Sequence, residues 1–249
     1  MKIRLLSDLH LEFEPWTPPP AAADVVILAG DIHQHTVGLH WARETFARAE
    51  IIYVAGNHEY YGASLGLLDE LRSVAGTLGI HLLEQSEAVI GGVRFLGATL
   101  WTDHCLYGAE RRGEAMDVAD ERMLDYRVIR TDRGWLTPER TSDIHEETVQ
   151  WLETALRMPF AGRSVLVTHH GVHRQSVAPR FEDDPLNPAF ASDLNDLIED
   201  SRLILCCHGH THDARDFMIG NARVLCNPKG YPGELPADRG FRPELVVEI

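Results

Sequence analysis

The chain has 249 residues, with 23 Lys and Arg against 38 Asp and Glu, so its formal net charge at pH 7 is −15. A hydrophobic share of 44% with 24% charged residues is typical of globular proteins and excludes disordered, collagen-like and coiled-coil chains. The acidic balance disfavours long nucleic acids as partners, and no apolar run approaches the ~20 residues that span a membrane. Four cysteines, two of them adjacent, favour a reducing cytoplasm over a disulfide framework.

Short apolar runs alternate with amphipathic segments through the first part of the chain. The predicted elements are strands at 3–7, 24–29 and 51–55 and helices at 37–49 and 65–74. This alternation is typical of a mainly parallel sheet covered by helices. Gly91-Gly92, between two apolar runs, predicts a hairpin.

Residues 103–140 differ from the rest because they are rich in charge. Met116, Ala119 and Met123 fall at helical spacing there, which favours a solvated surface helix with one apolar stripe over a dedicated binding element. A second long helix is predicted at 142–156. The remaining predicted strands lie at 164–168, 203–207, 216–219, 222–226 and 244–248. We expect one α/β domain over residues 1–249, with a charged helical insertion at about 103–140.

Polar side chains follow the ends of five predicted strands. The five segments are Asp8-Leu9-His10, Gly30-Asp31, Gly56-Asn57-His58-Glu59, His169-His170 and Gly209-His210-Thr211-His212. Because ligands bind beyond the carboxyl ends of strands in open α/β sheets, loops from separate strands can meet there at one point. Imidazole nitrogens and carboxylate oxygens together suit divalent ions such as Mn, Fe, Zn or Co. Two such ions about 3.5–4 Å apart can clamp both oxygens of a phosphoryl transfer.

The motifs differ in specificity. An Asp-x-His or His-x-His pair is expected by chance roughly once in such a chain, whereas Gly-Asn-His-Glu is expected in about one chain in a few hundred. All five in this order resemble the calcineurin-like metallophosphoesterase superfamily, and they span residues 8–212. The resemblance implies a four-layer αββα sandwich, two mixed β-sheets flanked by helices, with a dinuclear metal centre on one edge. It also implies hydrolysis of phosphomonoesters or phosphodiesters by a metal-bound hydroxide.

The resemblance assigns a role to each motif residue. One divalent ion is expected on Asp8, His10, Asp31 and His212, and a second on Asp31, Asn57, His169 and His210. His58 is expected to face the substrate, where an imidazole can stabilise charge or protonate the leaving oxygen. Glu59 is expected to orient its neighbours. Of the adjacent His169 and His170, we take His169 as the ligand.

The other histidines are expected to be structural or exposed, namely His33, His35, His40, His81 and His145. His104, His173 and His208 lie nearer the motifs and could line a pocket, although a structural role is preferred. Cys206 and Cys207 are expected to pack on the strand before the fifth motif.

The leading hypothesis is a metal-dependent phosphoesterase that acts on a small phosphodiester, with a protein phosphatase as the alternative. A non-catalytic scaffold would lack a ligand or the imidazole at position 58, and none is missing. An amide ligand beside a free imidazole suits phosphoryl chemistry better than hydrolysis of carbon–nitrogen bonds. Arg174 and Arg180 are candidates for substrate binding, or else they pair with Asp183 and Asp184. The physiological substrate, the native metals and the oligomeric state stay open.

Overall fold

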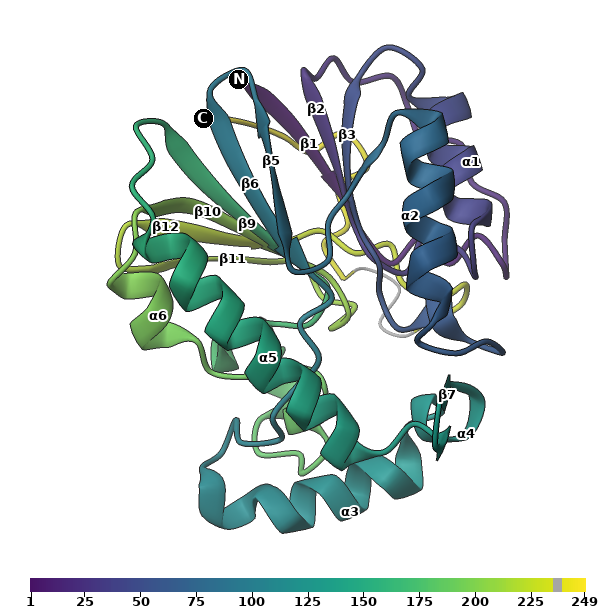
Figure 1. Cartoon of the computed structure of the whole chain (residues 1–249), viewed down its shortest axis with the longest axis vertical. Helices are drawn as coiled ribbons and strands as arrows, with labels where there is room; N and C mark the ends of the chain where they lie inside the picture. Colours follow the sequence, from purple (N-terminus) through teal and green to yellow (C-terminus); the bar gives the residue numbers. More distant parts are fainter. Residues whose placement is uncertain (235–238) are drawn as a thin grey trace.

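Two β-sheets packed face to face, with helices on both outer sides, make up the fold in a computed structural model that describes residues 1–234 and 239–249 (Figure 1). The first sheet has the order β13 (Val246–Glu248), β1 (Lys2–Leu6), β2 (Val25–Ala29), β3 (Glu50–Val54) and β4 (His81–Leu82). Its strands are parallel except for β13, which pairs antiparallel with β1. The expected four-layer sandwich is confirmed.

The second sheet contains the strands from the middle and the end of the chain. Its order is β11 (Arg215–Ile219), β12 (Ala222–Cys226), β10 (Leu203–His208), β9 (Arg163–Thr168), β6 (Val93–Ala98) and β5 (Ser86–Ile90). The inner strands run parallel, whereas the edge strands β5 and β11 pair antiparallel with their neighbours. The hairpin predicted at Gly91-Gly92 is therefore confirmed as the β5–β6 turn.

Side chains that alternate along the strands build separate cores on the two faces of each sheet. Ile3, Leu5 and Ile27 point to the interior between the sheets, where they join Phe95 and Val167 of the second sheet in one buried cluster. The intervening side chains of β1 and β2 pack beneath the outer helices instead. Because both faces of the strands are buried, the sequence shows continuous apolar runs rather than polar alternation.

Helices cover the outer face of each sheet. The first sheet is covered by α1 (Val37–Thr45) and α2 (Leu67–Leu78), and the second by α5 (Pro138–Arg157) and α6 (Asn195–Glu199). The long helix α5 begins four residues earlier than expected, because Thr137 caps it and Pro138 occupies its first position. The Thr137 side chain accepts a 3.3 Å hydrogen bond from the backbone N–H of Arg140.

The charged segment 103–140 contains α3 (Arg112–Arg122), α4 (Asp125–Val128) and a small hairpin of β7 (Arg130–Thr131) and β8 (Gly134–Trp135). In Figure 1, α3 lies at the lower end of the molecule, below the loops that leave the sheets. Ala119, in the middle of the predicted apolar stripe, is fully buried, and Met116 and Met123 are half-buried. The segment therefore places a partly buried helix, α3, next to those loops.

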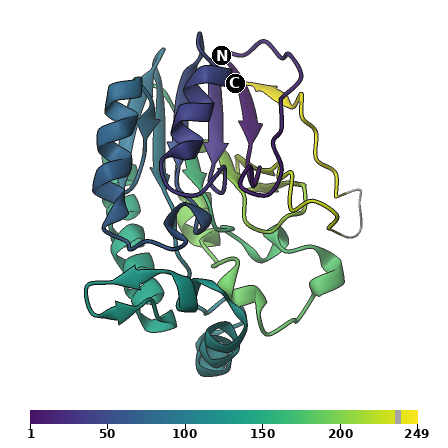
Figure 2. The same ribbon diagram turned by 90° about the vertical axis from the view of Figure 1, so that its right-hand side faces the viewer.

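The two ends of the described chain lie side by side (Figure 2), and the backbone N–H of Ile249 donates a 3.0 Å bond to the carbonyl of Met1. Between β12 and β13 the chain returns along the first sheet and passes the loop after β1. There the N–H groups of Lys229 and Gly230 bond to the carbonyls of Ser7 and Asp8, at 3.1 and 2.9 Å. No helix in the described parts of the chain has the length and apolar character that crossing a membrane requires.

Candidate functional site

Five loops carry the residues expected to bind metal, and each leaves the carboxyl end of a strand. The loops after β1, β2 and β3 come from the first sheet, and those after β9 and β10 come from the second. All seven candidate side chains are buried. The ligand atoms of six of them form two groups, each within 4.8 Å: Asp8, His10 and His212, and Asp31, His169 and His210.

In the first group, two imidazoles meet at a carboxylate. The Nε2 atoms of His10 and His212 lie 3.1 Å apart, and Nε2 of His212 lies 3.5 Å from Oδ1 of Asp8. The Nδ1 atom of His10 lies 3.2 Å from Glu12. That of His212 lies 2.8 Å from Glu234. Because an ionised carboxylate only accepts hydrogen bonds, Nδ1 of each ring carries a hydrogen, and in the neutral rings Nε2 presents its lone pair to the centre.

In the second group, His169 brings two acceptors together. Its Nδ1–H donates a 2.9 Å bond to the carbonyl of Ala29, so in the neutral ring, the form that binds a metal, Nε2 holds the lone pair. That Nε2 lies 3.0 Å from Oδ1 of Asn57 and 3.4 Å from Oδ2 of Asp31. Acceptor atoms that converge without a hydrogen between them are stabilised by a cation.

Asp31 lies between the two groups. Its Oδ2 is 3.4 Å from Nε2 of His169 and 3.8 Å from Nε2 of His10, so one oxygen is within reach of both. Its Oδ1 accepts a 2.9 Å bond from the backbone N–H of His58. This placement is what a carboxylate that bridges two ions requires.

The side chains fit divalent metal ions on three observations. Oδ2 of Asp8 and Nε2 of His210 are buried polar atoms with no hydrogen-bond partner among the described residues, which is costly without a ligand. Burial alone would lower the pKa of His169, yet the carboxylates of Asp31 and Asp8 raise it to about 9, so the local potential favours cations. The mixed imidazole, carboxylate and amide donors suit transition metals.

Close approach explains the motif glycines. A Cβ on Gly56 would lie 2.1 Å from Oδ1 of Asp31, and one on Gly209 would lie 2.5 Å from Oδ2 of Asp8. Several candidate ligands also adopt the left-handed backbone region, which few non-glycine residues occupy and which is concentrated at functional sites. These ligands, with their φ angles, are Asp8 (51°), His10 (46°), Asp31 (55°), His210 (66°) and His212 (52°).

Glu59 holds the loops after β2 and β3 against each other. Its carboxylate accepts hydrogen bonds from the backbone N–H groups of Asp31 and Ile32, both at 3.0 Å, and of Gly56, at 2.7 Å. It also accepts a 2.7 Å bond from the hydroxyl of Tyr53. Burial and the nearby charge of Asp31 raise the pKa of Glu59 to about 7. Glu59 thus orients its neighbours, as the sequence suggested.

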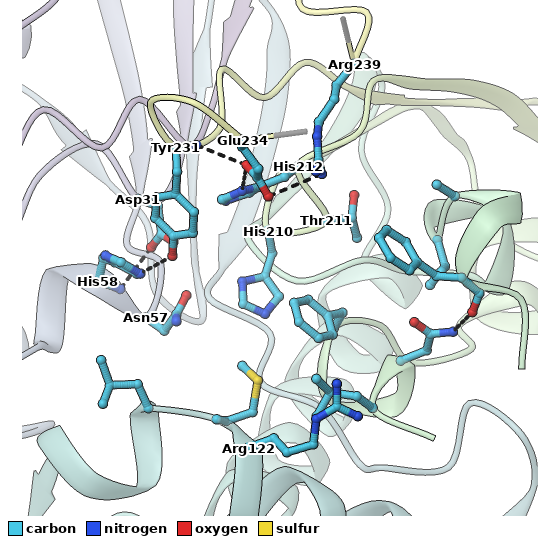
Figure 3. Close-up of a pocket in the computed structure, with 18 of the residues that line it drawn as sticks. Asp31, Asn57, His58, Arg122, His210, Thr211, His212, Tyr231, Glu234 and Arg239 are labelled. Atoms are coloured by element: carbon cyan, nitrogen blue, oxygen red, sulfur yellow. Dashed lines mark hydrogen bonds and ion pairs between the residues drawn. The ribbon is translucent and has the colours of Figure 1, made fainter. Parts of the chain in front are cut away.

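His58 lies beside the metal-ligand groups with both ring nitrogens engaged. Its Nδ1 is 2.8 Å from Glu12 and its Nε2 is 2.9 Å from the hydroxyl of Tyr231 (Figure 3). A ring nitrogen of His58 also lies within 4.8 Å of ligand atoms of His10 and Asp31, but both of its nitrogens have hydrogen-bond partners among the described residues. Burial disfavours the imidazolium, but the charges of Asp31 and Glu12 outweigh it and raise the pKa of His58.

Four site residues lie outside the motifs and were not identified from the sequence: Glu12, Asp125, Tyr231 and Glu234. Glu12 follows His10 by two residues, so the alternation Asp-x-His-x-Glu was a usable local signal. Asp125 begins α4 and accepts a 2.7 Å bond from Nδ2 of Asn57. Asp125 and Tyr231 have no local signal, because the folded topology alone brings them to the site.

A cavity of about 610 Å³ opens beside the metal-ligand groups. Asp31, Asn57, His58, His210 and His212 form its polar wall. Its apolar wall consists of Phe13, Met123, Leu124, Val177, Ala178, Phe181, Leu186 and Phe190. The end of α3 therefore borders the site, whereas the sequence favoured a merely solvated helix.

The two arginines proposed to bind substrate are not among the residues that line this cavity. Arg174 is exposed, and Arg180 forms two hydrogen bonds, of 2.7 and 2.5 Å, with the carboxylate of Asp213 rather than with Asp183 or Asp184. Arg122 and Arg239 line the cavity instead. Each contacts a carboxylate: Arg122 is 3.6 Å from Asp184 and Arg239 is 3.2 Å from Glu234. Closeness in sequence to the fourth motif therefore does not identify the arginines that line the cavity.

The geometry also distinguishes the remaining histidines. Nδ1 of His170 lies 3.1 Å from the carbonyl of Thr99, and burial lowers its pKa to about 3, whereas the neighbouring His169 belongs to a ligand group. His104, His173 and His208 are not among the residues that line the described cavity. Cys206 and Cys207 are buried on β10, as expected.

Comparison with known proteins identifies the family. The model of the calcineurin-like phosphoesterase family matches residues 1–214. The chain belongs to this family. Its metal-dependent chemistry agrees with the donor groups described above.

Individual relatives are distant in sequence. The chain is 24% identical to the [acyl-carrier-protein] phosphodiesterase PptH of Mycobacterium tuberculosis over 92% of its own length and 78% of the relative. It is 22% identical to the uncharacterized protein L509 of Acanthamoeba polyphaga mimivirus, over 99% of the chain and 96% of the relative. The crystal structure of the phosphopantetheinyl hydrolase PptH superposes with a TM-score of 0.72 at 22% identity, covering 93% of this chain and 90% of that one. This likeness confirms the fold.

Proposed function

We propose that the protein is a dinuclear metal-dependent phosphodiesterase that hydrolyses a small diester. The observation that carries this proposal is Asp31, whose Oδ2 lies within 4 Å of a ligand nitrogen in each of the two groups. Two divalent ions held by these groups would supply Lewis-acid stabilisation of charge and a reactive water at neutral pH. Asp8, His10 and His212 would hold one ion with Asp31.

The second ion would lie with Asp31, Asn57, His169 and His210. His58 is the side chain that we propose acts directly on the substrate, because it borders the cavity and both its ring nitrogens are hydrogen-bonded to residues outside the expected ligand set, Glu12 and Tyr231. Glu12 holds its Nδ1, which fixes the ring and leaves Nε2 for the leaving oxygen. A positioned imidazole of this kind typically contributes 10²–10⁴-fold to the rate.

The cavity favours a diester over a monoester. At neutral pH a monoester carries up to two negative charges and a diester carries one, and both lining arginines already contact carboxylates. A second esterified group also gives the apolar wall something to bind. Met123, Phe181 and Phe190 are placed to contact such a group, since they line the cavity that contains His210. The name of the relative PptH, a phosphodiesterase, supports the same choice.

The relative also suggests a substrate to test. PptH is named for its action on acyl carrier protein, so an acyl carrier protein bearing its phosphopantetheine group belongs in the substrate panel. An elongated, partly apolar ester arm of this type matches a cavity that combines apolar residues with Asn187 and Arg122. Small nucleotide-like diesters form the comparison set.

The decisive experiment compares hydrolysis of bis(p-nitrophenyl) phosphate with that of p-nitrophenyl phosphate, each with manganese and with a chelator. We expect faster, chelator-sensitive cleavage of the diester. Faster cleavage of the monoester would replace the proposal with a phosphatase. No turnover of any diester by protein that holds its metals would favour a non-catalytic relative.

His58→Ala is the matched control for this assay. We expect the variant to retain both metals, measured by elemental analysis, while kcat for the diester falls by about 10²–10⁴-fold. A contaminating hydrolase would be unaffected by the substitution. Loss of metal from the variant would make His58 a ligand rather than a group that acts on substrate.

A further inference from the structure

Tyr231 is a prominent side chain of the site that the sequence motifs do not explain. It lies between β12 and β13, beyond residue 214 where the family match ends. Its ring centroid is 4.3 Å from that of His10 and 4.6 Å from that of His212. Figure 3 shows its hydroxyl directed at His58 and Asp31, between the metal-ligand groups and the cavity.

The backbone around Tyr231 is fixed to the loops that carry the candidate ligands. The N–H of Gly230 donates a 2.9 Å bond to the carbonyl of Asp8. The N–H of Tyr231 donates a 3.1 Å bond to Glu234, which also accepts the bond from Nδ1 of His212. The tyrosine therefore keeps a defined position relative to the centre, although its side chain is partly exposed.

The surroundings of His58 leave one direction for a substrate. Nδ1 faces Glu12, and one face of the ring stacks on Tyr61, with 4.1 Å between the ring centroids. The ring of His10 lies edge-on, with its centroid 4.4 Å away. Only Nε2 remains among the ring's polar atoms, and the hydroxyl of Tyr231 lies 2.9 Å from it. A substrate oxygen that reaches Nε2 must therefore come to the place where this hydroxyl lies.

We propose that the Tyr231 hydroxyl binds a phosphoryl oxygen of the substrate and so frees Nε2 of His58 for the leaving oxygen, an inference that rests on the proposed function. A phenol donates one hydrogen bond, and phosphoryl oxygens are strong acceptors. When a phosphoester enters, the contact between the Tyr231 hydroxyl and Nε2 is replaced by a hydrogen bond from the O–H of Tyr231 to that oxygen. The O–H bond stays intact, so Tyr231 contributes binding and orientation and transfers no proton.

The test compares Tyr231→Phe with Tyr126→Phe, which removes a phenol hydroxyl on α4 that lies 3.3 Å from the hydroxyl of Thr141 on α5. Inorganic phosphate is titrated calorimetrically into each protein loaded with manganese. We expect Tyr231→Phe to weaken phosphate binding by about tenfold, as for loss of one charge-assisted hydrogen bond, with unchanged metal content. The control variant should bind phosphate as the unaltered protein does.

The same titration in a His58→Ala background separates direct contact from action through the imidazole. If the hydroxyl touches the phosphoryl group, Tyr231→Phe still weakens phosphate binding when His58 is absent. If the hydroxyl serves only to position His58, the effect of Tyr231→Phe disappears in that background, and the inference is overturned. Unchanged phosphate affinity in the single variant, or loss of its metals, also overturns it.

Failure of the proposed function remains distinguishable from failure of this inference. Phosphate binding requires no turnover, so it is measured even if no diester is hydrolysed. Phosphate binding that depends on Tyr231, without hydrolysis of any ester, would support the inference while rejecting the diesterase. If the protein hydrolyses a diester and Tyr231→Phe leaves kcat/KM unchanged, the proposed function is supported and the role of Tyr231 is rejected.

Discussion

A single carboxylate oxygen, Oδ2 of Asp31, lies between ligand nitrogens from both groups. We expect Asp31→Asn to lower metal content as well as activity, because a neutral amide binds cations less strongly and its nitrogen cannot bridge them. The loss in metal affinity should exceed the roughly 10–100-fold that follows removal of an outer hydrogen-bond partner. Elemental analysis of the purified variant beside diester hydrolysis measures both effects.

Asp216→Asn is the matched control for this substitution. Asp216 pairs with Arg223 on the exposed side of β11, at 2.7–2.8 Å, and does not line the cavity. The same change of a carboxylate to an amide should therefore leave metal content and turnover unaltered there. Full metal occupancy in Asp31→Asn would refute a bridging role for Asp31.

At the residue scale, the sequence predicts the members of the centre better than their partners. The candidate ligands directly follow apolar strand runs, so their meeting at one sheet edge follows from strand direction alone. Glu234 and Asp125 contact the site across 22 and 68 residues of chain, in bonds to His212 and Asn57. No local pattern encodes contacts of that range. The pairing of Arg180 escaped the sequence for the same reason, since its partner Asp213 lies 33 residues away.

At the element scale, the short helix α4 reaches the candidate metal centre through Asp125. Its Oδ1 accepts a 2.7 Å bond from Nδ2 of Asn57, which turns the amide oxygen of Asn57 toward His169. We expect Asp125→Ala to weaken metal binding by about 10–100-fold, as is typical when the outer partner of a ligand is removed. Asp125→Asn keeps an oxygen that can accept this hydrogen bond, so its metal affinity should fall by less.

Metal titration of the two variants, followed by manganese content and diester turnover, checks this order. Asp120→Ala is the control, because Asp120 is an exposed acid on α3. If Asp125→Ala binds metal as tightly as the unaltered protein, the hydrogen bond does not orient Asn57. An equal loss in the alanine and asparagine variants would show that the carboxylate charge matters rather than its geometry.

Periodicity predicts the long elements and misses the short ones. The core strands and α1, α2, α3 and α5 appear at the predicted places. Each helix is long enough to repeat apolar residues at helical spacing, and each core strand forms a continuous apolar run. The two-residue strands β4, β7 and β8 are too short for any period and depend on tertiary pairing. The charged segment likewise looked like a solvated face, and only its position beneath the loops brings Met123 to the cavity.

At the scale of the whole molecule, buried neutral histidines make folding stability depend on pH. His104 is buried beside Thr141 of α5 and Tyr126 of α4, and burial lowers its pKa to about 4. The unfolded chain, with a pKa near 6.5, binds the proton more readily, so stability falls as pH drops from about 6.5 toward 4.

We therefore expect His104→Gln to reduce the loss of stability between pH 7 and pH 5 by about 2 kcal/mol, since glutamine does not titrate. Urea unfolding at both pH values, with variant and unaltered protein loaded identically with metal, gives the difference. Other histidines titrate equally in both proteins and cancel. An unchanged pH dependence in the variant would show that His104 takes up its proton while folded.

Metal ions bound at this centre would also connect the two sheets. Asp8, His10, Asp31 and Asn57 follow strands of the first sheet, and His169, His210 and His212 follow strands of the second. A ligand bound only by the native state at 1,000 times its Kd adds about 4 kcal/mol to the free energy of unfolding. For about 250 residues, that corresponds to a rise in Tm of roughly 8–16 °C.

Chelation should accordingly lower the Tm by an amount of this order. The size of the decrease should follow metal affinity across the variants. His58→Ala should show the full decrease, because its metals are retained, and Asp31→Asn a smaller one, because it starts with less metal. Scanning calorimetry with and without chelator measures the decrease in Tm for each variant, and elemental analysis gives the metal content with which it is compared. If the chelator removes the metal from the unaltered protein and the Tm does not change, the ions do not stabilise the junction between the sheets.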